Sequence, residues 1–279
     1  MSLTSFLAQN ADVRERFKLE FRKPAFTAIK PLLAPPLTTH YTTVGTAFDY
    51  LLRFVIQRLN PLTLDKGYWV AEVAADALIE ADLYIKARKI IVAAKKHLHA
   101  YLQSGLLSED LIRSALLLAT IDPIYRAGVG HDNIGVIDER DMEDLQHLMA
   151  IVDENNFIAR QLALINPTFG KASHLVGGAD ADLVIDDIII DIKTVKKLTL
   201  DRKTYDQIMG YYTLHQIASV GELEPKLNIN KVGIYFARHA YLHIMPIADM
   251  VNMETYLDFL EWFKQRAQQD FPAARLALN

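Results

Sequence analysis

The stretch that most constrains the fold of this chain is GGADADLVIDDIIIDIK, at residues 177–193. Two runs of mostly β-branched aliphatic residues, ADLVID and DIIIDIK, meet at Asp186 and Asp187. Runs of this composition favour strands, and a two-residue polar junction between them is typical of a tight turn. The stretch therefore predicts a β-hairpin that turns at Asp186–Asp187.

Charged side chains recur at alternating positions of this hairpin. With a two-residue turn, Asp182 lies opposite Asp191, and Asp180 and Lys193 leave the sheet on the same face. Opposed Cβ atoms are about 5 Å apart, and like charges at that distance destabilise a sheet. A divalent cation such as Mg²⁺, which prefers oxygen ligands, would remove this repulsion. The pattern predicts a metal site with an amine beside it. An alternative fits the alternation equally well: an amphipathic hairpin whose acids face solvent and whose isoleucines face the core.

The rest of the sequence predicts a helical first half and an α/β second half, so the expected fold class is α/β (α+β). Residues 23–37 hold four prolines and cannot form a continuous helix. Apolar residues at helical spacing then predict helices over 42–60, 69–105, 106–123 and 138–156. After the first hairpin, the pattern predicts a helix over 201–218, a second hairpin over 231–247 and a closing helix over 248–269.

Composition narrows the classes of function. The chain of 279 residues has no linker of flexible composition, which predicts one compact unit. It has no cysteine, so disulfides, cysteine-ligated zinc, iron–sulfur clusters and thiol nucleophiles are excluded. The N-terminal residues lack the pattern of a signal peptide, and no apolar stretch is long enough to span a bilayer. A cytoplasmic protein without a membrane partner is therefore expected.

The charge distribution allows nucleic-acid binding only through a local patch. The net charge is −4, which gives no global attraction to phosphate. Basic residues do gather after the hairpin, at Lys196, Lys197, Arg202 and Lys203. Such a cluster could neutralise phosphates and give salt-sensitive binding. The alternative is a solvated loop before a helix, where lysines are common.

Three motifs together resemble a known family. Asp182, followed nine residues later by Asp191-Ile192-Lys193, resembles the D…(D/E)xK signature of the PD-(D/E)XK nuclease superfamily. Gln207-Ile-Met-Gly-Tyr211, which begins fourteen residues after Lys193, is similar to the QxxxY element of the RecB-like branch. Upstream, Gly45-Thr-Ala-Phe-Asp49 resembles the GxxxH helix of that branch, with aspartate in place of histidine. The order of these parts along the chain also agrees.

The resemblance implies a restriction-endonuclease-like core, with a mixed central β-sheet flanked by helices. Residues 1–279 would form a single nuclease domain, with the core from about 42–60 and 166–279 and a large helical insertion at about 66–165. The implied activity is Mg²⁺- or Mn²⁺-dependent hydrolysis of phosphodiester bonds in DNA, by an exo- or endonuclease. The implied partners are DNA and a possible protein docked on the insertion. The iron–sulfur cluster of some relatives is excluded here by the lack of cysteine.

Carried over to this chain, the resemblance also implies roles for individual residues. Lys193 would be the catalytic lysine, and Gln207 and Tyr211 would support it near the substrate. The implied metal ligands are Asp182, Asp191, the backbone carbonyl of Ile192, Asp49, and Asp180 as an alternative to Asp182. The replacement at Asp49 leaves open a second possibility: an inactive nucleic-acid-binding or scaffold protein that has kept the fold.

Overall fold

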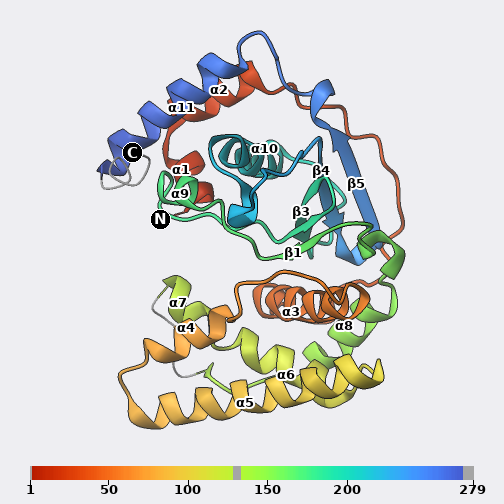
Figure 1. Cartoon of the computed structure of the whole chain (residues 1–279). Helices are drawn as coiled ribbons and strands as arrows, with labels where there is room; N and C mark the ends of the chain where they lie inside the picture. Colours follow the sequence, from red (N-terminus) through yellow and green to blue (C-terminus); the bar gives the residue numbers. More distant parts are fainter. Residues whose placement is uncertain (1, 128–132, 273–279) are drawn as a thin grey trace.

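The computed structural model describes residues 2–127 and 133–272, and in it a five-stranded sheet lies between two layers of helices (Figure 1). The strands are β1 (Ala163–Ile165), β2 (Leu183–Ile185), β3 (Ile188–Lys193), β4 (Lys231–Phe236) and β5 (Tyr241–Pro246). The helices before the sheet are α1 (Leu3–Gln9), α2 (Ala11–Glu20), α3 (Tyr41–Leu59), α4 (Val70–Asp76), α5 (Ala81–Ser104), α6 (Glu109–Ala119), α7 (Asp122–Ala127) and α8 (Glu139–Ala150). Those that follow β1 are α9 (Lys171–His174), α10 (Arg202–Ile217) and α11 (Tyr256–Asp270).

The sheet is mixed, as the resemblance implies. Its strands lie in chain order, and all neighbours are antiparallel except β3 and β4, which are parallel and joined through α10. The predicted register of the first hairpin is confirmed, because Ile185 pairs with Ile188 and Leu183 with Ile190. Asp186, in the turn, has a φ of +52°, a conformation that aspartate tolerates better than most residues. The second hairpin, β4–β5, also forms and turns at Ala240.

The strands β2, β3 and β4 are buried on both faces of the sheet. Leu183 and Ile190 point toward the layer of α3 to α8, and Val184 and Ile189 point toward the layer of α1, α2 and α9 to α11. The alternation of the hairpin therefore separates two cores rather than a core from solvent. Asp182, Asp191 and Lys193 are in phase with Val184 and Ile189, so they face the layer that contains α10.

Some boundaries differ from the predictions. The segment predicted as one helix over 69–105 is two helices, α4 and α5, separated by residues 77–80. Pro123 does not end a helix; α6 ends at Ala119 and Pro123 lies in the first turn of α7, where proline is tolerated. The closing helix α11 begins at Tyr256, eight residues later than the predicted 248.

The sequence analysis missed α1, α2, β1 and α9, which are all short. Helix α1 packs on α10 at Gly210, where an added Cβ would lie 2.8 Å from Leu3 Cδ2. Helix α2 lies beside α11, with the rings of Phe17 and Phe259 5.4 Å apart (Figure 1). No helix in the described ranges is long and apolar enough to cross a bilayer.

The proline-rich segment, residues 22–40, contains no helix, as predicted for 23–37, and runs along the outer side of β5 (Figure 1). It is fixed where Arg238 donates a hydrogen bond to the carbonyl of Ala34 at 2.9 Å. Arg238 also forms a fully buried, two-pronged ion pair with Asp144 of α8, at 2.7 and 3.0 Å. This one guanidinium therefore joins the extended segment, the β4–β5 turn and the helical layer around α3.

The buried His215 should make the folded protein less stable at acidic pH. Its Nδ1 accepts a hydrogen bond from Val220 N–H at 3.2 Å, and Nε2 donates to the carbonyl of Leu227 at 3.1 Å, which fits only a neutral ring. Burial, with the nearby Lys226, lowers the pKa of His215 from 6.5 to about 4. Between these values the unfolded chain binds more protons than the folded chain, so stability falls as the pH falls. The expected loss is about 3 kcal/mol.

This loss can be measured with urea unfolding of wild type and His215→Gln at pH 6.5 and pH 4, the two pKa values concerned. Wild type should lose about 3 kcal/mol more than His215→Gln over this interval. His99→Gln, which removes an exposed histidine, should behave as wild type. Parallel pH profiles for wild type and His215→Gln would contradict the prediction.

Candidate active site

The two aspartates of the signature meet at the C-terminal end of β3. Asp191 is 1% exposed, whereas Asp182 is partly exposed. The hairpin register extends from Leu183–Ile190 to place Asp182 opposite Asp191, and Ile192 N–H donates a 2.6 Å hydrogen bond to Asp182 Oδ2. The alternative in which the acids face solvent is therefore wrong for Asp191. Asp182 is only partly exposed, because its carboxylate accepts this hydrogen bond from β3.

Asp191 is a buried carboxylate, so its charged form needs positive charge nearby to be stable. Burial raises its pKa well above the usual range, against the opposing effect of Lys193, and the charge of Asp182 raises it further. Lys193 Nζ lies 2.7 Å from Asp191 Oδ2. Burial alone would lower the pKa of Lys193, but the attraction of Asp191 outweighs it, and the pKa is raised. The lysine therefore stays an ammonium group beside the carboxylate.

Lys193 is tied to α10 through the QxxxY pair. Its Nζ donates a 3.1 Å hydrogen bond to Gln207 Oε1, and Gln207 Nε2 donates a 2.9 Å hydrogen bond to Tyr211 OH. Gln207 and Tyr211 are one turn apart and so lie on the same face of the helix. Tyr211 is buried and stacks on Phe169 with ring centroids 5.6 Å apart. Burial, with the charges of Asp191 and Asp182, raises the pKa of Tyr211 far above its usual value, so it stays protonated.

The other predicted metal ligands are in different environments. Asp49 forms a two-pronged ion pair with Arg53, one turn along α3. Asp180 is exposed and pairs with Lys66 at 2.6 Å. The geometry therefore favours Asp182 over Asp180 as the partner of Asp191. A metal-binding role for Asp49 and for the backbone carbonyl of Ile192 stays a prediction.

The donor set fits a hard divalent cation. Asp191 Oδ2 is fully buried, and the ammonium group of Lys193 lies 2.7 Å from it. Such an oxygen gains most from direct contact with a cation. Across residues 2–127 and 133–272, no three His, Cys, Asp or Glu side chains form a ready-made metal cluster. Two carboxylates are nevertheless typical for Mg²⁺, which fills its remaining positions with water and substrate phosphate oxygens.

The basic patch after the hairpin is only partly available to a ligand. Lys196, Lys197 and Lys203 are exposed. Arg202 instead pairs with Asp206 at 2.8 Å and lies over the ring of Tyr205, so it mainly stabilises the start of α10. A nucleic-acid contact is therefore better supported for the three lysines than for Arg202.

Sequence reasoning missed two cations next to the site, Arg53 and Lys66. The charges of Asp49 and Asp182 both act on Arg53 and raise its pKa, although its burial opposes them. The i, i+4 spacing of Asp49 and Arg53 was a usable signal, because such pairs meet on one helix face. The pairing of Lys66 could not be predicted from spacing, because its partner Asp180 is distant in the sequence.

Comparisons of the chain with models of protein families, with curated proteins and with solved structures find no match. A functional assignment therefore depends on the geometry of the site and on the resemblance of its motifs.

Proposed function

We propose that this protein is a metal-dependent nuclease that hydrolyses phosphodiester bonds in DNA. The observation that carries the proposal is the convergence of Asp182, Asp191 and Lys193 at one end of β3. The contact from Lys193 through Gln207 to Tyr211 adds support, because chance motifs would not be expected to join on separate elements. The β2–β3 hairpin, α10 and the parallel strand β4 would then belong to a restriction-endonuclease-like core.

In this function, Asp182 and Asp191 would hold Mg²⁺ or Mn²⁺. When bound, the ion would polarise the scissile phosphate and lower the pKa of a water molecule. Lys193, already an ammonium group, would stabilise the negative charge that develops on the phosphate oxygens. Gln207 fixes the lysine Nζ by accepting a hydrogen bond, and the buried Tyr211 fixes Gln207 in turn. These two residues act as positioning residues, because they reach the phosphate only through Lys193.

The surroundings of the site support a nucleic-acid substrate, and the choice of DNA rests on the resemblance of the motifs. The exposed Lys196, Lys197 and Lys203 follow the catalytic strand directly and could neutralise neighbouring phosphates. The rest of the protein has net negative charge, so binding would be confined to this side of the molecule.

The proposal is tested by incubating the protein with end-labelled single- and double-stranded DNA in Mg²⁺, in Mn²⁺ and in EDTA. Cleavage is expected with either metal and should stop in EDTA, because the carboxylates then lack the ion that binds the phosphate. Higher salt should slow cleavage through weaker DNA binding. Cleavage that persists in EDTA, or no cleavage of either substrate with either metal, would contradict the proposal.

A further inference from the structure

The proline-rich segment brings positive charge to the end of the sheet where the candidate active site lies. Lys193 pairs with Phe236 of β4, and Phe236 pairs with Tyr241 of β5. Lys30 of the segment lies over the ring of Tyr241, with Nζ 5.3 Å from the ring centroid. Because neighbouring strands are about 4.8 Å apart, the backbone at Tyr241 is about 10 Å from the backbone at Lys193. Lys30 and Lys193 therefore lie at the same end of the sheet.

The proline-rich segment also lies against the basic loop, residues 194–203, which runs from the end of β3 into the first turn of α10. The ring of the buried His239 stands between the two segments. Its Nδ1 is 2.9 Å from the carbonyl oxygen of Pro31, and its Nε2 is 3.2 Å from that of Lys196. One side chain thus holds the two segments side by side.

The proline-rich segment is fixed in place before any ligand binds. Tyr205 OH of α10 donates a 2.9 Å hydrogen bond to the carbonyl of Arg22. Further along, Leu33 N–H donates a 2.9 Å hydrogen bond to the carbonyl of Arg238. The prolines between and beyond these points restrict the backbone further. A surface that is already ordered loses little conformational entropy when a ligand binds to it.

The lysines of these two segments have no carboxylate partners. Residues 22–40 contain no Asp or Glu. The basic loop contains one acid, Asp201, which caps α10 by accepting a hydrogen bond from Thr204 N–H. In the part of the chain that the structure describes, none of the five lysines forms an ion pair, and all are exposed except Lys23, which is half-exposed. We call these five the lysine track: Lys23, Lys30, Lys196, Lys197 and Lys203.

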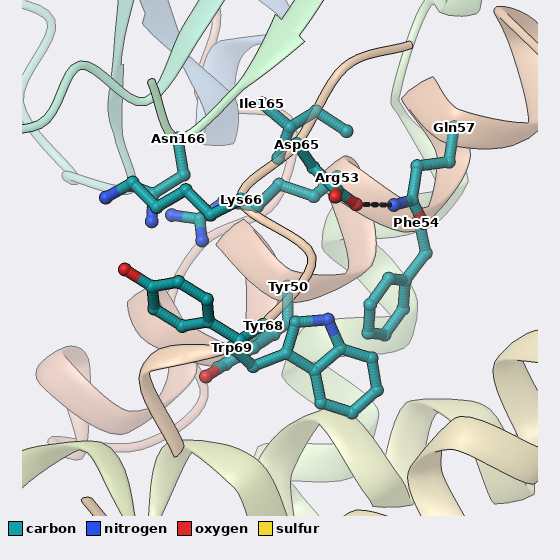
Figure 2. Close-up of a pocket in the computed structure, with 10 residues that line it drawn as sticks. All are labelled: Tyr50, Arg53, Phe54, Gln57, Asp65, Lys66, Tyr68, Trp69, Ile165 and Asn166. Atoms are coloured by element: carbon teal, nitrogen blue, oxygen red, sulfur yellow. Dashed lines mark hydrogen bonds between the residues drawn. The ribbon is translucent and has the colours of Figure 1, made fainter. Parts of the chain in front are cut away.

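Two other cations near the candidate active site are, in contrast, held by carboxylates. Arg53 pairs with Asp49, and Lys66 pairs with Asp180 at 2.6 Å. The hollow that these two cations line beside Trp69 (Figure 2) has room of about 20 Å³, enough for about one water molecule. Of the two groups of cations, the lysine track is therefore the one available to phosphates.

We infer that the lysine track binds the phosphate backbone of the DNA strand beside the cut. A strand advances about 3.4 Å per nucleotide along the helix axis, so Lys30 would meet it about three nucleotides from the phosphate at Lys193. Contacts of this kind position the strand and carry no sequence information. This inference rests on the proposed nuclease function, because it assigns the lysine track to the same substrate.

An anionic membrane is the other partner whose chemistry fits this surface. Ile29, next to Lys30, is 94% exposed, and basic surfaces with exposed apolar side chains can bind anionic lipids. The position of Lys30 and Lys193 at one end of the sheet favours DNA, because a strand held at the candidate active site would continue onto the track.

The first test compares two charge-matched double variants in EDTA, so that the readout does not depend on cleavage. Lys23→Gln/Lys30→Gln removes two cations of the lysine track, and Lys89→Gln/Lys96→Gln removes two exposed cations of α5. Fluorescence anisotropy measures binding of a labelled oligothymidylate and of a labelled duplex over a range of salt concentrations. The track variant should bind at least about 10-fold more weakly at low salt, and its plot of log affinity against log salt should be shallower by about 1 to 2. The α5 variant should bind as wild type.

The second test locates the DNA by crosslinking. The chain has no cysteine, so Ile29→Cys introduces a single thiol that can carry a benzophenone crosslinker. Ile79→Cys is the matched control, because Ile79 is 98% exposed and lies between α4 and α5. On irradiation, DNA should crosslink at position 29 and not at position 79. Sedimentation with vesicles of phosphatidylcholine and phosphatidylserine tests the membrane with the same double variants.

A wild-type affinity and salt dependence of Lys23→Gln/Lys30→Gln, or an equal loss in the α5 variant, would overturn this inference. A DNA crosslink at position 79 with none at position 29 would overturn it too, as would the absence of DNA binding by wild type. If the track variant lost binding to vesicles but not to DNA, the surface would belong to a membrane. DNA cleavage by wild type in any of these cases would leave the nuclease proposal standing. Binding on the track without cleavage in Mg²⁺ or Mn²⁺ would instead contradict only the nuclease activity.

Discussion

Replacement of Lys193 by alanine is expected to lower the rate of metal-dependent DNA cleavage by about 10²- to 10³-fold. The ammonium group lies 2.7 Å from Asp191 Oδ2, and Gln207 holds it in place from α10. A positive charge fixed at this point would stabilise the phosphate in the transition state more than in the ground state, so its loss should lower kcat. Single-turnover cleavage, with the protein in excess over DNA, measures the effect.

Two further variants make this prediction specific. Lys193→Met keeps the aliphatic stem of the side chain and should lose activity to the same extent, so loss of packing would not explain the effect. Lys203→Ala removes an exposed lysine one turn before Gln207 and should change DNA affinity rather than the chemical step. A wild-type single-turnover rate in both Lys193 variants would rule out the proposed role of the lysine.

Replacement of Asp191 by asparagine should abolish both divalent-metal binding and cleavage. Asparagine has almost the same shape as aspartate, but it lacks the negative charge that a cation requires from this buried position. The change leaves Asp182 as the remaining carboxylate of the pair. Loss of a direct ligand should weaken Mn²⁺ binding by more than about 100-fold, beyond the effect usual for outer-shell residues.

Asp187→Asn is the matched control for this variant. Asp187 lies in the same hairpin, but its carboxylate is at the turn and pairs with Lys231 at 3.0 Å. Its replacement should leave metal binding and cleavage unchanged. Thermal unfolding of both variants separates loss of the metal site from loss of the fold.

Features that depend on residues close together in the sequence, such as turns, strand register and helix faces, are predicted well. The Asp186–Asp187 turn sets the register of the hairpin, and that register alone places Asp182 opposite Asp191. The spacing of Gln207 and Tyr211 places both side chains on one face of α10, as expected from helical periodicity. Both hairpins and the helix between them form as predicted, because alternating and helical patterns are clear in the second half of the chain. The mixed sheet with flanking helices, which the resemblance implies, is confirmed.

Long-range packing was not predictable from these patterns. A period of two shows that a strand has two different faces, but not that a second helical layer covers the face with the acids. The burial of Asp191 therefore depends on the packing of α10 against β3, for which the sequence has no local signal. The pairs Lys66–Asp180 and Arg238–Asp144 join residues far apart in the chain, so spacing gives no information about them.

The most direct test of the central claim is calorimetric titration of the protein with Mn²⁺ in the absence of DNA. A metal site at the end of β3 predicts saturable binding to wild type, no measurable binding to Asp191→Asn and wild-type binding to Asp187→Asn. Equal Mn²⁺ affinity of wild type and Asp191→Asn, or no binding to wild type, would contradict a metal site formed by Asp182 and Asp191.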